Sequence, residues 1–208
     1  MMEDNGNTLT ASLLKSKSGE FDLESIHTLN LSHMELTDLG CLGECSGLER
    51  LDLSFNDITK LYALAGLMNV TDLNLSANRI TSLDGLQSVD NLKSLNLSGN
   101  LIGRLETLKC LSSLEKLSYL RLRDVTQDLS NPICMNISYK EDVLSILPNL
   151  VTLDDERLTG HGKEMFKLCL ELDSVIKDLL AECKDVIMTA DEKIMTLTEG
   201  DYMGGGMT

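Results

Sequence analysis

Residues 49–64 read ERLDLSFNDITKLYAL, and residues 71–86 repeat the same pattern as TDLNLSANRITSLDGL. The pattern also occurs in residues 27–42 and 93–108, so this part of the chain repeats every 22 residues. Each copy contains two leucines separated by one polar residue: Leu29 and Leu31, Leu51 and Leu53, Leu73 and Leu75, Leu95 and Leu97. This alternation predicts a short strand with one buried face. A unit of this length cannot bury its leucines alone, so the units are expected to stack.

Two further features recur in each unit. An asparagine follows the second leucine by three residues, as Asn56, Asn78 and Asn100. Its amide carries both donors and an acceptor, so it can pair backbone groups that leave the strand ladder at the bend. Apolar residues then recur at a spacing of three, for example Ile58, Leu61 and Leu64, which favours a 3₁₀ turn.

Together these features resemble the leucine-rich repeat, whose pattern is L-x-x-L-x-L-x-x-N. The resemblance implies an α/β fold: a right-handed leucine-rich-repeat solenoid with short parallel strands and 3₁₀ turns on its convex side. We expect five parallel strands, or six with the segment around 151–153.

The fifth unit departs from the pattern. Leu117, Leu120 and Leu122 keep the spacing within it, but Leu120 follows Leu95 by 25 residues, and a detour, VTQDLS, precedes Asn131. The segment from Asn131 resembles the C-terminal cap of intracellular leucine-rich repeats, a cap type found in the spliceosomal protein U2A-prime and in ciliary axoneme proteins. The matching positions are Asn131, Pro132, Tyr139, Leu147, Pro148, Leu150, Leu153 and Asp154.

The ends of the solenoid need covers for its exposed leucines. Thr8 or Thr10 is a candidate N-cap for a short helix that contains Leu13 and Leu14, and Gly19 then turns the chain. Beyond the cap, the apolar period becomes helical and predicts a long amphipathic helix. We therefore expect a disordered N-terminus (1–7), an N-terminal cap (8–26), repeats (27–130), a C-terminal cap (131–161), an amphipathic helix (162–198) and a disordered tail (199–208).

The composition limits the classes of partner. The formal net charge of −15 argues against nucleic-acid binding and against anionic membranes. No run of about 18 apolar residues occurs, and the first residues lack the apolar core of a signal peptide. We expect a cytoplasmic protein, with the cilium or the nucleus as alternatives, and six reduced cysteines.

Solvent-facing residues of the strands are the candidate binding residues, because they would form the concave face. The predicted protein-binding set is Arg50, Asp52, Asp72, Asn74, Asn96, Tyr119, Arg121 and Arg123. Tyr119, Arg121 and Arg123 match the composition of binding hot spots and form a basic cluster in an acidic chain. The alternative is that the arginines pair with Asp124, Asp128 and Asp154. The column Ser32, Ser54, Ser76 and Ser98 is expected to make the middle of the face shallow.

Catalytic or metal chemistry has little support in the sequence. Cys41 and Cys45 lack the usual metal-ligand spacing, and packing explains them better. The three histidines do not complete a nucleophile and acid set. We expect no enzyme activity, no cofactor and no metal site.

The sequence therefore predicts a non-enzymatic scaffold or adaptor that binds a protein partner, whose identity the sequence does not give. Alternatives are an assembly-linked protein of cilia or ribonucleoprotein particles, which the cap type implies, and a phosphatase regulator, which shares the repeat length. We expect a monomer. The apolar stripe of the helix is longer than capping needs. The helix is therefore expected either to fold back onto the convex side or to contact a partner. Association between copies through this helix is one form of the second alternative.

Overall fold

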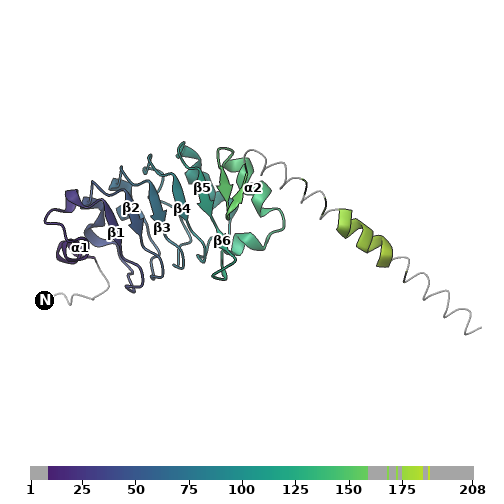
Figure 1. Ribbon diagram of the computed structural model, residues 1–208, viewed down its shortest axis with the longest axis horizontal. Helices are drawn as coiled ribbons and strands as arrows, with labels where there is room; N and C mark the ends of the chain where they lie inside the picture. Colours follow the sequence, from purple (N-terminus) through teal and green to yellow (C-terminus); the bar gives the residue numbers. More distant parts are fainter. Residues whose placement is uncertain (1–8, 159–167, 169–171, 173–174, 185–186, 188–208) are drawn as a thin grey trace, which may run out of the picture. The chain divides into compact units, whose positions relative to one another are not determined.

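The computed structural model describes residues 9–158, 168, 172, 175–184 and 187 (Figure 1). It consists of two units, Met1–Thr159 and Gly160–Thr208, which are described separately. The expected disordered ends at 1–7 and 199–208 lie outside the described residues, as does most of the helix expected at 162–198.

A seven-stranded sheet in the order β1-β2-β3-β4-β5-β8-β9 runs the length of the first unit (Figure 1). Its strands are β1 (Thr28–Asn30), β2 (Arg50–Asp52), β3 (Asp72–Asn74), β4 (Ser94–Asn96), β5 (Tyr119–Arg121), β8 (Thr152–Leu153) and β9 (Glu156–Arg157). Neighbours from β1 to β8 pair in parallel, and β9 pairs antiparallel with β8. The predicted five parallel strands and the sixth in the cap are thus confirmed.

The repeat leucines share one register. Leu51 pairs with Leu29 and with Leu73, and the column continues through Leu95 and Leu120. The second leucine of each unit is fully buried, as is the case for Leu53, Leu75, Leu97 and Leu122. The core is therefore a stack of leucine layers that runs along the whole first unit.

Short 3₁₀ helices follow three of the four strands β1 to β4, as the spacing of three predicts. They are η2 (Gly40–Glu44), η3 (Tyr62–Gly66) and η4 (Leu105–Ser113), and each buries leucine side chains in the core. Cys45 is fully buried beside η2, and Cys41 packs against the same core, which agrees with the packing role expected for this pair.

The asparagines form a ladder of side-chain amides that links successive units. Asn78 donates from Nδ2 to the carbonyl oxygens of Leu53 and Leu75, and its Oδ1 accepts from the backbone N–H of Ile58. Asn56 and Asn100 repeat this arrangement in their own units. The structural role expected for these residues is confirmed, because the amides pair backbone groups that would otherwise be buried without partners.

The N-terminal end of the stack is closed by α1 (Ala11–Ser18), followed by η1 (Leu23–Ser25). The hydroxyl of Thr10 accepts from the backbone N–H of Leu13, so Thr10 is the N-cap of this helix. Gly19 ends the helix in the left-handed conformation with φ of 77°. Leu14 on this helix is fully buried. The helix thus covers leucines of the first repeat that would otherwise be exposed at the end of the stack.

The detour after β5 is a small hairpin of β6 (Arg123–Asp124) and β7 (Leu129–Ser130), which pair antiparallel. After it come η5 (Pro132–Met135) and α2 (Tyr139–Ile146), which leads into β8. Asn131 is the asparagine of the fifth unit, since its Nδ2 donates to Leu97 and Leu122 and its Oδ1 accepts from Ile102. The hairpin is thus an insertion between the strand of the fifth unit and its asparagine.

In the second unit, residues 175–184 are helical, as are the described residues 168, 172 and 187. The apolar side chains Leu172, Val175, Ile176 and Leu179 are exposed. Across the described part of the chain, no helix is long and apolar enough to cross a membrane.

Candidate functional site

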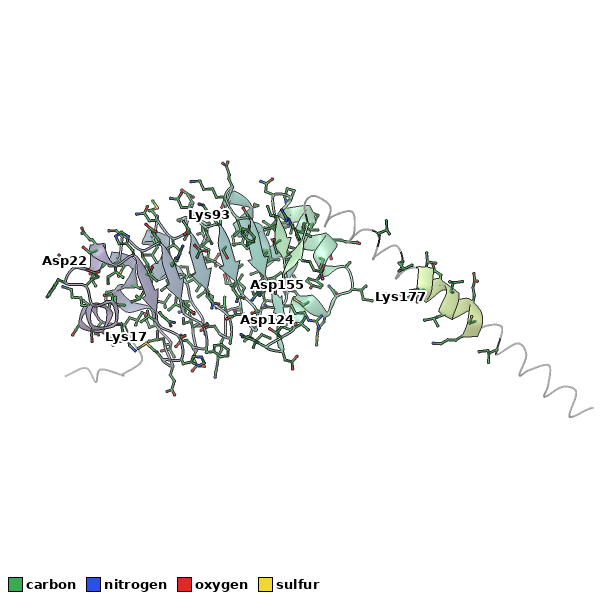
Figure 2. The ribbon with its side chains drawn as sticks, in the orientation of Figure 1. Lys17, Asp22, Lys93, Asp124, Asp155 and Lys177 are labelled. Carbon is green, nitrogen blue, oxygen red and sulfur yellow. The ribbon has the colours of Figure 1, made fainter. Side chains whose placement is uncertain are left out.

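The solvent-facing side of the sheet is hollowed, with a volume of about 500 Å³. Every parallel strand from β1 to β8 contributes to the lining of this hollow. The side chains on the first unit are drawn in Figure 2, where Asp124 and Asp155 mark the C-terminal end of the sheet. Seven of the eight predicted binding residues line the hollow: Arg50, Asp52, Asp72, Asn74, Asn96, Tyr119 and Arg121.

The first column across the hollow consists of Thr28, Arg50, Asp72, Ser94, Tyr119 and Thr152, which are paired in register. Arg50 Nε lies 3.9 Å from Asp72 Oδ2, and both side chains are more than half exposed. Tyr119 is 51% exposed, and small residues flank it, with Ser94 on one side and Thr152 on the other. About half of the side chain is therefore open to solvent, and among the described residues its hydroxyl has no hydrogen-bond partner.

The second column contains Asn30, Asp52, Asn74 and Asn96, and each of these side chains bonds the serine two residues later. Asp52 Oδ1 accepts from the backbone N–H of Ser54 at 2.9 Å and from its hydroxyl at 2.6 Å. Asn74 and Asn96 bind Ser76 and Ser98 in the same way. The Oδ1 atom of each side chain thus accepts both hydrogen bonds from the serine at the end of the strand. Only the second polar atom, Oδ2 of the aspartate or Nδ2 of the asparagines, is available to a ligand.

This arrangement corrects the expected role of the serines. Ser54, Ser76 and Ser98 are buried, and Ser98 is fully so, so they do not form the floor of the hollow. Period-two alternation places them on the solvent side, but the strands end after three residues and the chain turns inward. Phe55 and Ala77, which follow them, have left-handed φ values of 56° and 53°.

Arg121 is the most constrained residue of the predicted set. Its Nη1 lies 3.2 Å from Asp124 Oδ2, and its Nη2 pairs with Asp155 Oδ1. The sequence left open that the arginines pair with Asp124, Asp128 and Asp154. That alternative is confirmed for the pair of Arg121 and Asp124. Asp155 was not among the expected partners. Two carboxylates offset the charge of Arg121, so the C-terminal end of the hollow is not the basic spot that composition predicts.

Arg123 lies elsewhere. The sequence places it on the strand face in register with the serines, but the structure places it in β6, outside the lining of the hollow. Its backbone N–H donates to Asp154 Oδ1 at 2.9 Å. Its exposed side chain forms no ion pair with the residues that the structure describes. The hairpin insertion causes this difference, because the main sheet ends at Arg121 in this unit.

The sequence prediction missed Asp155 and Thr152 as lining residues. A signal for them exists in the run LVTLDD, whose Leu153 keeps the inward position of a repeat strand. Thr152 is then the solvent-facing residue before it. Asp154 and Asp155 both have left-handed φ values, 50° and 66°, and this turn carries Asp155 back to Arg121.

Among the described residues, no group of three His, Cys, Asp or Glu side chains is placed to hold a metal ion. Burial raises the pKa of the Cys45 thiol to about 11. The group stays protonated at neutral pH and is a poor nucleophile.

Comparison with known proteins agrees with the repeat pattern and the cap. A family model described as a leucine-rich repeat matches residues 23–168. Leucine-rich repeat-containing protein 61 of Homo sapiens is 59% identical over 175 residues, which cover 84% of this chain and 68% of the human protein. The protein of the same name from Mus musculus is 59% identical over 170 residues, which cover 82% of this chain and 66% of the mouse protein. The chain thus spans about two thirds of the length of these relatives.

Among solved structures, a chain of the Drosophila melanogaster SNF/U2A′ complex is similar, with a TM-score of 0.63 and 26% identity. The similarity covers 82% of this chain and 98% of that chain. The Leptospira interrogans LRR protein LIC12759 matches with a TM-score of 0.51 and 28% identity, over 63% of this chain and 37% of that protein.

Proposed function

The chain belongs to the leucine-rich repeat family, and on that premise we propose that it is a non-enzymatic scaffold or adaptor whose hollowed sheet face binds a protein partner. The observation that carries the proposal is the lining of the hollow. It is open, it is about 500 Å³ in volume, and six parallel strands line it with polar and charged side chains around one exposed tyrosine.

This lining suits recognition of another protein better than chemistry. An exposed tyrosine and an arginine are residue types enriched among those that carry most of the energy of protein interfaces. Tyr119 and Arg50 supply them at two places in the first column. The carboxylates of Asp52 and Asp72 and the amides of Asn74 and Asn96 add directional hydrogen bonding between them.

A second candidate is a role in assembling a larger particle, such as a ribonucleoprotein. It is supported by the similarity to a chain of the SNF/U2A′ complex, almost all of which this chain covers. The two candidates differ in the identity of the partner and share the proposed binding face.

The test compares two matched double variants as bait in affinity purification, with captured proteins quantified by mass spectrometry. Arg50→Ala with Tyr119→Ala removes the two exposed anchors of the hollow. Arg79→Ala with Tyr62→Ala is the control, because Arg79 also pairs with an aspartate of the neighbouring unit and Tyr62 is also exposed. Neither control residue lines the hollow.

We expect the hollow variant to lose the proteins that the wild-type chain captures and the control variant to keep them. The exposed positions should leave the free energy of unfolding nearly unchanged in both variants. If both variants capture the same proteins in the same amounts as the wild-type chain, the hollow is not the binding face. Capture of RNA-particle subunits that depends on Arg50 and Tyr119 would favour the assembly candidate.

A further inference from the structure

The charged groups that line the hollow do not balance. Carboxylates outnumber guanidinium groups, because the charged lining residues are Asp52, Asp72 and Asp155 against Arg50 and Arg121. Arg121 is already paired with Asp155 and with Asp124. The charges that remain to be matched lie on β2 and β3, where Asp52 and Asp72 have only the guanidinium of Arg50 beside them.

Asp52 has no cation of its own. Its Oδ1 accepts from the backbone N–H and from the hydroxyl of Ser54. It forms no ion pair with the residues that the structure describes. Its Oδ2 and its negative charge are therefore available to a ligand in the hollow.

Asp72 is only weakly neutralised. Arg50 Nε lies 3.9 Å from Asp72 Oδ2, which is longer than a hydrogen bond, and this oxygen accepts instead from the hydroxyl of Thr71 at 2.7 Å. Both side chains of the ion pair are more than half exposed, and pairs of this kind contribute little. The charge of Asp72 thus also remains available to a ligand.

The two carboxylates lie diagonally across neighbouring strands. Arg50 pairs with Asp72, and Asp52 pairs with Asn74, so Asp52 and Asp72 are one strand and two residues apart. A strand spacing of about 4.8 Å and a rise of about 3.3 Å per residue separate their Cα atoms by about 8 Å. This separation accommodates one ammonium or guanidinium group between the two carboxylates.

The lining on β4 and β5 adds hydrogen bonding without charge selection. Asn96 Oδ1 accepts from Ser98, so its Nδ2 remains as a donor, and Tyr119 adds a hydroxyl. Groups of this kind bind the backbone carbonyl oxygens of a peptide. An acidic segment would meet Asp52 and Asp72 as like charges, which is unfavourable. The hollow is therefore complementary to a segment that carries a cation.

This inference rests on the function proposed above and specifies the chemistry of the partner. We propose that the hollow recognises a basic segment of a partner protein and seats one lysine or arginine side chain between Asp52 and Asp72. The backbone of the segment continues towards Tyr119, where its carbonyl oxygens accept from the neutral donors.

A phage-displayed library of random peptides tests the charge of the segment. Peptides are selected on the wild-type chain, and those whose binding is weakened by Tyr119→Ala are kept. Tyr119 reports binding in the hollow independently of the aspartates, because it lies on β5, two strands away from Asp72. We expect the kept peptides to share a lysine or an arginine. Kept peptides that share an acidic residue, or no charged residue, would overturn the proposal.

Two matched double variants locate the cation. Asp52→Asn with Asp72→Asn removes both carboxylate charges, and Asn74 shows that asparagine makes the same bonds to serine at the position of Asp52 in the next unit. Asp90→Asn with Glu106→Gln is the control, because it removes two charges at exposed positions outside the hollow. A kept peptide should bind the first variant more than about fivefold more weakly than the wild-type chain. It should bind the control nearly as well as the wild-type chain, so that a general effect of net charge is excluded.

Replacing the basic residue of the peptide by glutamine completes a double-mutant cycle. The replacement should weaken binding to the wild-type chain by a similar factor and change binding to the Asp52→Asn, Asp72→Asn variant little. Additive effects would show that the cation binds elsewhere and would overturn the proposal. Peptides that need Tyr119 but bind this variant as tightly as the wild-type chain would also overturn it, while leaving the hollow as a binding face. If Tyr119→Ala weakens no selected peptide, this inference fails, and the affinity purification described above decides separately whether the hollow binds a protein.

Discussion

Tyr139 and Asp154 join the cap to the last full repeat through a single carboxylate. The phenolic hydroxyl of Tyr139 donates to Asp154 Oδ2 at 2.7 Å, while Asp154 Oδ1 accepts from the backbone N–H groups of Leu122 and Arg123 at 2.6 and 2.9 Å. Burial and the bond to Asp154 raise the pKa of Tyr139 well above its usual range. The tyrosine thus remains a donor, and it links α2, the end of β5 and the turn after β8.

Removing this hydroxyl should destabilise the first unit. Tyr139→Phe keeps the buried ring but leaves Asp154 Oδ2 without its donor, and hydrogen bonds to charged groups contribute about 1.5–3 kcal/mol. We expect a loss of that size in the free energy of unfolding, measured by urea denaturation. Tyr62→Phe is the control, because Tyr62 is 65% exposed and its change should stay within about 0.5 kcal/mol. Equal effects of the two variants would show that the bond to Asp154 contributes nothing.

Asn131 should contribute as much to the free energy of unfolding as the asparagines inside the regular repeats. Asn131→Ala removes its bonds to the backbone of Leu97, Leu122 and Ile102, and each buried group left unpaired costs about 1–3 kcal/mol. We expect a loss of more than about 2 kcal/mol in urea denaturation, similar to that of Asn78→Ala. The exposed Asn149 provides the control, Asn149→Ala. A loss below about 1 kcal/mol would mean that the fifth unit does not depend on its ladder amide.

The repeat could be predicted from the sequence because its signal is local and is repeated in every unit. Leu51 and Leu73, which are separated by the 22-residue spacing, are buried and in register. The prediction fails where contacts between distant segments decide the structure. Asp155 reaches Arg121 only through the turn after β8, and Arg123 leaves the main sheet because an insertion follows it.

The candidate site shows the same division. Alternation correctly places Arg50, Asp72 and Tyr119 on the hollowed face. It does not reveal that the strands end after three residues, and so it places the serines wrongly. Their hydroxyls are bonded by the side chains two positions earlier, which is a turn preference of Asn and Asp rather than a property of strands.

Gly99 should be required because of the hairpin that packs on it. His33, Phe55 and Ala77 occupy the same position in earlier units with φ values between 53° and 57°, so the backbone conformation alone does not demand glycine. A Cβ atom on Gly99 would lie 2.8 Å from Leu129 Cδ2. We therefore expect Gly99→Ala to cost about 1–3 kcal/mol through overpacking and strain, measured by thermal unfolding.

A double-mutant cycle separates these two causes. Leu129→Ala removes Cδ2 and Cγ, which would lie 2.8 and 3.3 Å from the new Cβ, and leaves Cβ at 3.1 Å. In this background Gly99→Ala should therefore cost less than it does in the wild-type chain. Simple addition of the two single effects would contradict the role assigned to Leu129.

The acid side of the stability profile should depend on Asp124, which is buried at the base of the hairpin. The hydroxyl of Thr126, the backbone N–H groups of Gln127 and Thr126, and the charge of Arg121 hold the pKa of Asp124 below its usual value, against the opposite effect of burial. The unfolded chain therefore binds this proton more readily than the native one. The stabilising contribution is complete above the unfolded pKa of about 4 and is lost as the pH falls through the lower folded value.

Asp124→Asn should accordingly lower the urea midpoint clearly at pH 7, and the difference in midpoint from the wild-type chain should narrow at about pH 3. Asp90→Asn, at an exposed position, should change the stability at pH 7 by less than about 0.5 kcal/mol. A gap that is as wide in acid as at neutral pH would show that Asp124 contributes through its shape and not through its charge.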